Sequence, residues 1–161
     1  MYNPIVYLTR KETFSACHRL NSTYLTPEEN LEVFGKCNHI NGHGHNYVVE
    51  ITVCGPINQK TGMVMNITEL KQIIKDVIFS KLDHKNLDKD VEFFKNNPST
   101  TENLAIYIWE NLRKSMKKPE LLHEVKINET EKNIVSYKGP FIPQHKRNHI
   151  SSCTNISSDS D

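Results

Sequence analysis

The sequence lacks the patterns that mark several classes of protein. Its four cysteines include no Cys-x2-Cys pair, so it has none of the closely spaced thiols that usually close a structural zinc site. No apolar run approaches the roughly 18 residues of a membrane-spanning helix. Charges of both signs are spread along the chain and leave a net charge of +1. This balance argues against nucleic acid and anionic membranes as partners.

The N-terminal segment has no basic region followed by a long apolar run, so we expect no secretory signal. The cysteines, Cys17, Cys37, Cys54 and Cys153, stand far apart in the sequence. Scattered cysteines without a secretory signal are typical of a reducing compartment. We therefore expect a cytoplasmic protein in which all four thiols are free.

The size of the chain predicts one small domain. It has 161 residues, of which 37% are hydrophobic, and this share is below that of a typical globular protein. A small and polar domain often depends on oligomerisation for its stability. Residues 142–161 are dominated by Ser, Asn, Asp and His, a composition typical of disorder. We expect a folded domain over residues 1–141 and a disordered tail after it.

Alternating apolar and polar residues predict strands in both halves of the chain. The first strand covers residues 4–20 and the second covers residues 43–54. Turn signals after the second strand predict that residues 43–66 form a hairpin with a long loop. Near the C-terminal end, residues 121–130 and 133–137 have the pattern of a second hairpin.

Two helices are expected between these strand pairs. Apolar residues at helical spacing mark residues 67–82, and Asn66 with Glu69 predicts reciprocal capping at the start of this helix. The capping-box pattern Ser99-Thr-Thr-Glu102 predicts a second helix that ends before Lys118-Pro119. The order ββ-α-α-ββ predicts an α+β fold, with a four-stranded antiparallel sheet and two helices on one face. Oligomerisation could close the free edges of such a sheet.

A pair of histidines suggests a metal site. His43 and His45 are separated by one glycine, and in a strand both imidazoles would point to the same face. His18 lies on the apolar face of the first strand and is the candidate third ligand. Three imidazoles with an open fourth position are typical of catalytic zinc. Two alternatives remain: His43 and His45 could be loop residues without a shared partner, and the nearby His39 could compete as a ligand.

Other polar residues have a functional and a structural interpretation. Cys37 stands six residues before His43. Asp83 and His84 follow directly after the first helix, where they could terminate it or form a proton relay. Glu129 continues the apolar face of its strand, so it lies at the wet end of that strand or is a buried acceptor that awaits a donor.

Taken together, several blocks of sequence resemble the 6-pyruvoyl-tetrahydropterin synthase family of tunnelling-fold pterin enzymes. The similarity runs from about Phe14 to Gly139, and each block alone is weakly specific. In chain order the blocks are Phe14-Ser-Ala-Cys-His-Arg-Leu20, Phe34-Gly-Lys-Cys-Asn38, Asn41-Gly-His-Gly-His-Asn-Tyr47, Thr61-Gly-Met-Val-Met-Asn66, Leu82-Asp-His-Lys-Asn-Leu87, Ser99-Thr-Thr-Glu-Asn103 and Tyr137-Lys-Gly139.

The resemblance implies both an assembly and a reaction. In the tunnelling fold, three subunits join their four-stranded sheets into one β-barrel, and two trimers stack into a homohexamer with sites between subunits. The family is a zinc-dependent lyase in tetrahydrobiopterin biosynthesis. It converts 7,8-dihydroneopterin triphosphate to 6-pyruvoyl-tetrahydropterin, with elimination of triphosphate and an internal redox shift.

The resemblance also implies roles for residues that match the family's motifs. Carried over by position, the Zn2+ ligands are His18, His43 and His45. The catalytic residues are Cys37, as the base that moves substrate protons, with Asp83 and His84 as its relay. The substrate-binding residues are Glu129, as the pterin anchor, with Thr100, Thr101 and Glu102. His39 and Ile40 depart from the family pattern, which raises a question about metal affinity but removes no ligand.

Two rival functions remain open. The related 6-carboxytetrahydropterin synthase shares the fold and the substrate, but the five residues between Cys37 and His43 and the Ser99–Glu102 block favour the pyruvoyl enzyme. The chain could also be a zinc-binding module without catalysis. A metal scaffold would have no need of Cys37, Asp83, His84 or Glu129.

Overall fold

A computed structural model of the chain describes residues 3–140. The tail expected at residues 142–161, which includes Cys153, lies outside the described residues. Within residues 3–140, no helix combines the length and the apolar character needed to cross a bilayer.

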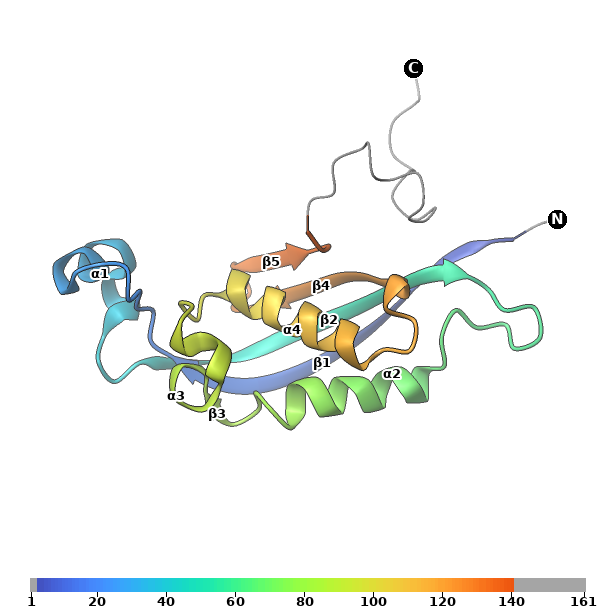
Figure 1. Cartoon of the computed structure of the whole chain (residues 1–161), viewed down its shortest axis with the longest axis horizontal. Helices are drawn as coiled ribbons and strands as arrows, with labels where there is room; N and C mark the ends of the chain where they lie inside the picture. The colour runs from blue at the N-terminus through green and yellow to red at the C-terminus, as the bar shows by residue number, and fades with distance from the viewer. Residues whose placement is uncertain (1–2, 141–161) are drawn as a thin grey trace, which may run out of the picture.

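A mixed sheet forms the centre of the domain (Figure 1). Its five strands have the order β3-β1-β2-β4-β5. Strands β1 (Ile5–His18), β2 (His43–Pro56), β4 (Leu122–Asn128) and β5 (Ile134–Tyr137) each run antiparallel to the next strand in this order. The sequence predicted these four strands but not the two-residue β3 (Lys85–Asn86), which pairs in parallel with the end of β1. The α+β class is therefore confirmed, with one short strand added.

The register between the two long strands sets the position of the expected site. β1 and β2 pair over their whole length, from Ile5 opposite Pro56 to His18 opposite His43. The same register places Ala16 opposite His45. Because side chains alternate along a strand, His18, His43 and His45 share the face of the sheet that carries the buried core residues Phe14 and Tyr47.

Two long helical segments cover this face, as predicted (Figure 1). Helix α2 (Ile67–Ile74) continues as one wider π-helical stretch through Lys75–Phe79, and helix α4 covers Thr101–Ser115. Their apolar faces pack into one core with the sheet, in which the fully buried residues include Leu70, Ile74, Ile78, Leu104, Ile108 and Leu112. Shorter helical segments lie in the loops: α1 (Pro27–Phe34), η1 (Gly35–Asn38), α3 (Leu87–Asp90), Glu92–Lys95 and Pro119–Leu121.

The predicted hairpin over residues 43–66 is wrong. Strand β2 ends at Pro56, and no strand returns through Met63–Asn66. Both edges of β2 are already paired, with β1 on one side and β4 on the other, so a returning strand would find no free edge. The segment instead folds around Asn58, whose side-chain oxygen accepts hydrogen bonds from the backbone N–H groups of Lys60 and Thr61.

The caps of the helices differ in part from the prediction. The N-cap of α4 is Thr100, whose hydroxyl accepts a hydrogen bond from the Asn103 N–H, and not Ser99. The Ser99 hydroxyl instead points toward Asp88 and donates to its Oδ1 at 2.6 Å. Asn66 caps α2 through the Thr68 N–H.

The expectation of four free thiols is also wrong. Cys17 and Cys37 are free, whereas Cys54 is disulfide-bonded. The cysteines therefore no longer argue for a reducing compartment, and the cytoplasmic localisation stays a prediction.

Candidate active site

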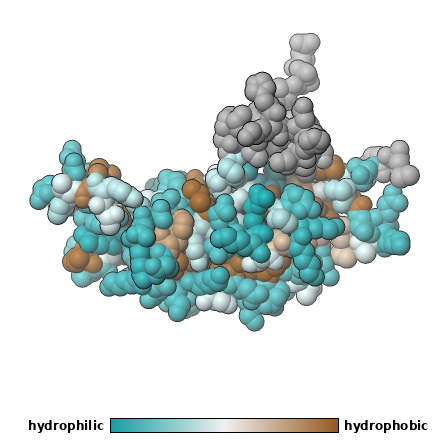
Figure 2. Space-filling view, viewed as in Figure 1, coloured by the Kyte–Doolittle hydropathy of each residue, from teal (hydrophilic) through white to brown (hydrophobic). Residues whose placement is uncertain are grey.

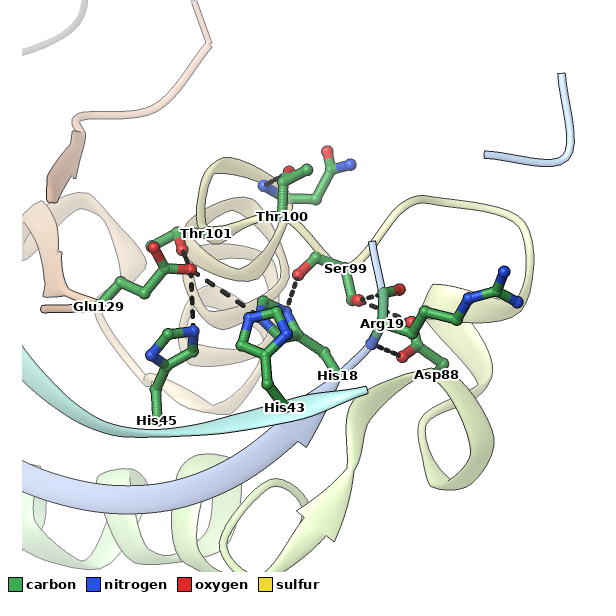
Figure 3. A network of polar contacts seen from close by, with 10 residues as sticks. His18, Arg19, His43, His45, Asp88, Ser99, Thr100, Thr101 and Glu129 are labelled. Atoms are coloured by element: carbon green, nitrogen blue, oxygen red, sulfur yellow. Dashed lines mark hydrogen bonds and ion pairs between the residues drawn. The ribbon is translucent and has the colours of Figure 1, made fainter. Parts of the chain in front are cut away.

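Three histidines converge at the paired ends of β1 and β2 (Figure 3). One ring nitrogen from each of His18, His43 and His45 lies within 4.8 Å of the other two. His18 Nε2 and His43 Nε2 are 3.1 Å apart. Gly42 (φ +67°) directly precedes β2. A Cβ atom at this position would lie only 2.7 Å from the His18 carbonyl oxygen, so the close approach of the Gly42 backbone to the end of β1 requires glycine.

The protonation of the cluster suits a metal ion. His18 Nδ1 donates its hydrogen to the Ser99 carbonyl oxygen at 2.6 Å, which leaves the lone pair of Nε2 free. Burial lowers the pKa values of His18 and His45 below the ordinary value of 6.5, although nearby Glu129 opposes the shift at both residues. His45 Nε2 is buried and has no hydrogen-bond partner. Three convergent imidazoles are a donor set that fits Zn2+ with an open position.

His39 does not take part in the cluster. Its ring nitrogen Nδ1 accepts a hydrogen bond from the Asn41 N–H at 3.2 Å, and the residue is exposed. It is a turn residue in the loop before β2. The alternative that His39 competes as a ligand therefore has no support in this geometry.

Glu129 lies beside the histidines, directly after β4. Its Oε1 is 3.9 Å from His18 Nε2 and 3.7 Å from His45 Nε2. The same oxygen accepts a hydrogen bond of 2.7 Å from the hydroxyl of Thr101 (Figure 3). The donor that the sequence left unidentified is therefore Thr101, and the carboxylate is held in place at the edge of the cluster.

A cavity of about 480 Å³ brings the expected substrate-binding residues together. Glu129, Thr100, Thr101 and Glu102 all line it, together with Leu20. The volume falls in the range of small-molecule sites. The side chain of Thr100 is engaged as the N-cap of α4 and that of Thr101 by Glu129, so Glu129 and Glu102 have the more available polar groups.

Cys37 lies in the short helix η1, and its thiol is half-buried and free. The Leu20 N–H donates to the Cys37 carbonyl oxygen at 2.9 Å, and Leu20 is part of the cavity wall. This backbone bond holds the cysteine segment near the cavity, although Cys37 itself does not line it.

Asp83 and His84 lie elsewhere. His84 Nδ1 is 2.9 Å from Asp83 Oδ2, and His84 has the left-handed backbone conformation (φ 59°), which is uncommon for a residue with a side chain. Burial opposes the lowered pKa of Asp83, but hydrogen bonds from the Ser15 N–H and from His84 outweigh it. His84 lines a second cavity, of about 370 Å³, with Ser15 and Cys17.

This second cavity opens on the other face of the sheet. Four residues of its wall, Ser15, Cys17, Gly44 and Asn46, alternate along β1 and β2 with residues of the histidine face. His45 is the one member of the cluster that borders it. The structure therefore assembles the histidines, Glu129 and the start of α4 within one chain, whereas Asp83 and His84 do not line the cavity that contains Glu129.

Sequence reasoning missed the residues behind the metal cluster. Ser99, Asp88 and Arg19 form a hydrogen-bonded network with His18 (Figure 3). These residues come from three segments that are distant in sequence, and a polar residue in a loop gives no periodic signal. Only the fold could have found them.

The fold and this arrangement define a tunnelling-fold pterin enzyme. A family model described as 6-pyruvoyl tetrahydropterin synthase matches residues 7–140, and the chain belongs to this family. The fruit fly (Drosophila melanogaster) 6-pyruvoyl tetrahydrobiopterin synthase is 67% identical over 164 residues, which cover 98% of each chain. The human protein of the same name is 54% identical over 132 residues, which cover 82% of this chain and 90% of the human one.

A solved structure gives the same result. The 6-pyruvoyl tetrahydropterin synthase of Caenorhabditis elegans superimposes with a TM-score of 0.84 at 50% sequence identity. The match covers 87% of this chain and 100% of that one. The similarity therefore extends over the whole described domain.

Proposed function

We propose that this chain is a zinc-dependent 6-pyruvoyl-tetrahydropterin synthase in tetrahydrobiopterin biosynthesis. It converts 7,8-dihydroneopterin triphosphate to 6-pyruvoyl-tetrahydropterin and eliminates triphosphate, which makes it a carbon–oxygen lyase. The observation that carries the proposal is the cluster of His18, His43 and His45 beside the Glu129 cavity. Family membership gives the substrate class, and the site supplies the chemistry.

Glu129 is the proposed anchor of the pterin ring. A pterin presents an amino group and a ring N–H side by side, and a carboxylate can accept both hydrogen bonds in a bidentate pair. Thr101 fixes the orientation of this carboxylate through its bond to Oε1. The nearby histidines then face the carbon side chain of a substrate that is held at Glu129.

Zn2+ bound by the three imidazoles would act as a Lewis acid toward oxygen atoms of the substrate side chain and so acidify the neighbouring C–H bonds. Cys37 would be the base that removes and returns these protons. A thiolate serves as a base near neutral pH where a nearby cationic group or metal lowers its pKa.

Asp83 and His84 would act as the relay that takes up and returns these protons. Because His84 lines a cavity other than the one that contains Glu129, we propose that this pair serves a site on a neighbouring subunit. The Asp83 carboxylate orients His84, whose Nδ1 lies 2.9 Å from Asp83 Oδ2. The complete active site would then form between subunits.

The edges of the sheet support assembly into a trimeric barrel and a homohexamer. β3 pairs with β1 only at Ala16 and Cys17, so among residues 3–140 most of β1 is an open edge, and β5 is the other edge. Tyr7 on β1 and Ile134 on β5 are each 49% exposed. Joining these edges between three subunits would close the sheet and bury both side chains.

A second apolar surface lies at the end of the molecule that carries α1, where Figure 2 shows hydrophobic residues at the surface. Leu31, Val33 and Ile40 are 63%, 63% and 72% exposed. Such a group of exposed apolar residues is typical of an interaction site.

Sedimentation that showed a stable and active monomer would rule out the proposed assembly.

Incubation with 7,8-dihydroneopterin triphosphate, with and without a chelator, tests the function. We expect release of triphosphate and a product with the mass of 6-pyruvoyl-tetrahydropterin, and we expect loss of both after removal of the metal. A product with the mass of 6-carboxytetrahydropterin would identify the related enzyme instead. Full zinc content without any turnover would identify a zinc-binding module.

A further inference from the structure

We infer that Asp88 is a positioning residue for the metal ligand His18. Its carboxylate binds two groups that hold His18. One is the backbone N–H of Arg19, the next residue, and the other is the hydroxyl of Ser99, whose carbonyl oxygen binds the imidazole ring. This inference deepens the proposed function and rests on it for the identity of the ion. All the hydrogen bonds on which the inference rests are formed within a single chain.

The first contact fixes the ring. Asp88 Oδ1 accepts a hydrogen bond of 2.6 Å from the Ser99 hydroxyl, and the carbonyl oxygen of the same Ser99 accepts the Nδ1 hydrogen of His18 at 2.6 Å. His18 and Ser99 are both 0% exposed. A carbonyl oxygen can only accept, so the orientation of the Ser99 peptide determines which ring nitrogen of His18 carries the hydrogen.

The second contact fixes the backbone. Asp88 Oδ2 accepts a hydrogen bond of 2.6 Å from the Arg19 N–H, and Arg19 directly follows His18 (Figure 3). One rigid carboxylate thus fixes the distance between the Ser99 segment and the end of β1. A change at Asp88 would free both supports of His18 together.

The helix that contains Asp88 does not need this carboxylate. The N-cap of α3 is Asn86, whose side-chain oxygen accepts from the Asp88 and Lys89 N–H groups. A second carboxylate in α3, Asp90, is exposed and accepts from the Asn86 N–H at 2.8 Å. Asp90 therefore supports the same helix without a bond to Ser99 or Arg19, and it provides a matched control.

Partners of this kind usually contribute to metal affinity. Removing the group that orients a ligating histidine typically weakens metal binding ~10–100-fold. We expect Asp88→Ala and Ser99→Ala to weaken Zn2+ binding within this range, and Asp90→Ala to bind Zn2+ as the unmodified chain does. The affinities are measured by competition with a chromophoric chelator.

A second measurement separates positioning from a general loss of structure. In the metal-free protein, the Nδ1 proton of His18 should give a far-downfield signal in the proton NMR spectrum, because the hydrogen bond is short and the ring is buried. We expect this signal to shift upfield or to disappear through exchange in Asp88→Ala and Ser99→Ala. It should be unchanged in Asp90→Ala.

The outcomes distinguish the two levels of the argument. If the unmodified chain binds no Zn2+, the proposed function fails, whereas the NMR comparison still tests the role of Asp88. Wild-type affinity in Ser99→Ala and in folded Asp88→Ala would overturn the inference. An unchanged Nδ1 signal together with weaker binding would overturn it too, because the loss would then not come from His18. Ser99→Ala keeps the bond from the Arg19 N–H to Asp88, so it supplies the test if Asp88→Ala does not fold.

Discussion

The absence of His84 from the wall of the Glu129 cavity leads to a quantitative prediction about mixed oligomers. Cys37 is tied by its carbonyl oxygen to Leu20, at the wall of the Glu129 cavity of its own chain. His84 borders a different cavity. Each active site should therefore take Cys37 from one subunit and His84 from another, and subunits with different defects should complement each other.

The expected activity follows from counting. Loss of a proton-transferring residue costs ~10²–10⁴-fold in rate, so Cys37→Ala and His84→Ala oligomers should each be nearly inactive. With random assembly from equal amounts, a site has an intact Cys37 in about half of cases and an intact His84 in about half. About one quarter of the sites should then contain both residues, and turnover should reach about a quarter of the wild-type value.

The assay is co-expression of the two variants with different affinity tags, two-step purification of the mixed oligomers and measurement of triphosphate release. The matched control is a mixture of Cys37→Ala with His43→Ala, because both changes damage the half-site of one chain and no mixed site is complete. Activity no higher than in this control would falsify the shared-site proposal. It would mean that His84 acts within its own subunit or not at all.

Three further predictions concern single residues. His43→Ala should lose most bound zinc, as measured by elemental analysis, whereas Cys37→Ala should keep zinc and lose ~10²–10⁴-fold in turnover; loss of zinc from Cys37→Ala would make the thiol a ligand instead. Thr101→Val removes a hydrogen bond to the Glu129 carboxylate worth about 1.5–3 kcal/mol. KM should therefore rise ~10–100-fold with zinc content unchanged. An unchanged KM would show that Thr101 does not support Glu129. Burial lowers the pKa of His18 in the folded chain. Just below pH 6.5 the unfolded chain therefore binds more protons than the folded chain does. The free energy of unfolding of the metal-free protein should decrease as the pH falls through that value. Urea titrations in chelator test this sign, and a rise in stability over the same interval would contradict it.

The sequence was a good guide wherever a local pattern decides the structure. The alternation along β2 indicated that His43 and His45 share a face. Once β1 and β2 pair along their whole length, His18 lies opposite His43. The apolar spacing of residues 67–82 and of α4 placed both long helices correctly. In each case the signal is a period of two or of 3.6 residues that the core requires.

The errors arose where distant segments compete for the same partner. Residues 63–66 have a strand-like composition, but a strand also needs a free edge, and β4 occupies the one that they would use. Ser99 has the right spacing for an N-cap, but its hydroxyl points toward Asp88 and donates to that carboxylate. Neither competitor can be recognised from the local sequence, because each enters the contact only through the tertiary fold.

The placement of Asp83 and His84 shows why adjacency to a motif does not identify a site. The family resemblance groups this pair with Cys37 and the zinc ligands, and the sequence does not say from which side of the sheet they approach. The structure answers through Ser15, whose N–H donates to Asp83 Oδ1 and whose carbonyl oxygen accepts from the His84 N–H. Ser15 lies between the core residues Phe14 and Ala16, so its side chain faces away from the histidine cluster. The backbone groups of a strand point along the plane of the sheet, so these two hydrogen bonds hold Asp83 and His84 at the edge of β1. If the pair acts in catalysis at a neighbouring subunit, this edge is where the two subunits would meet.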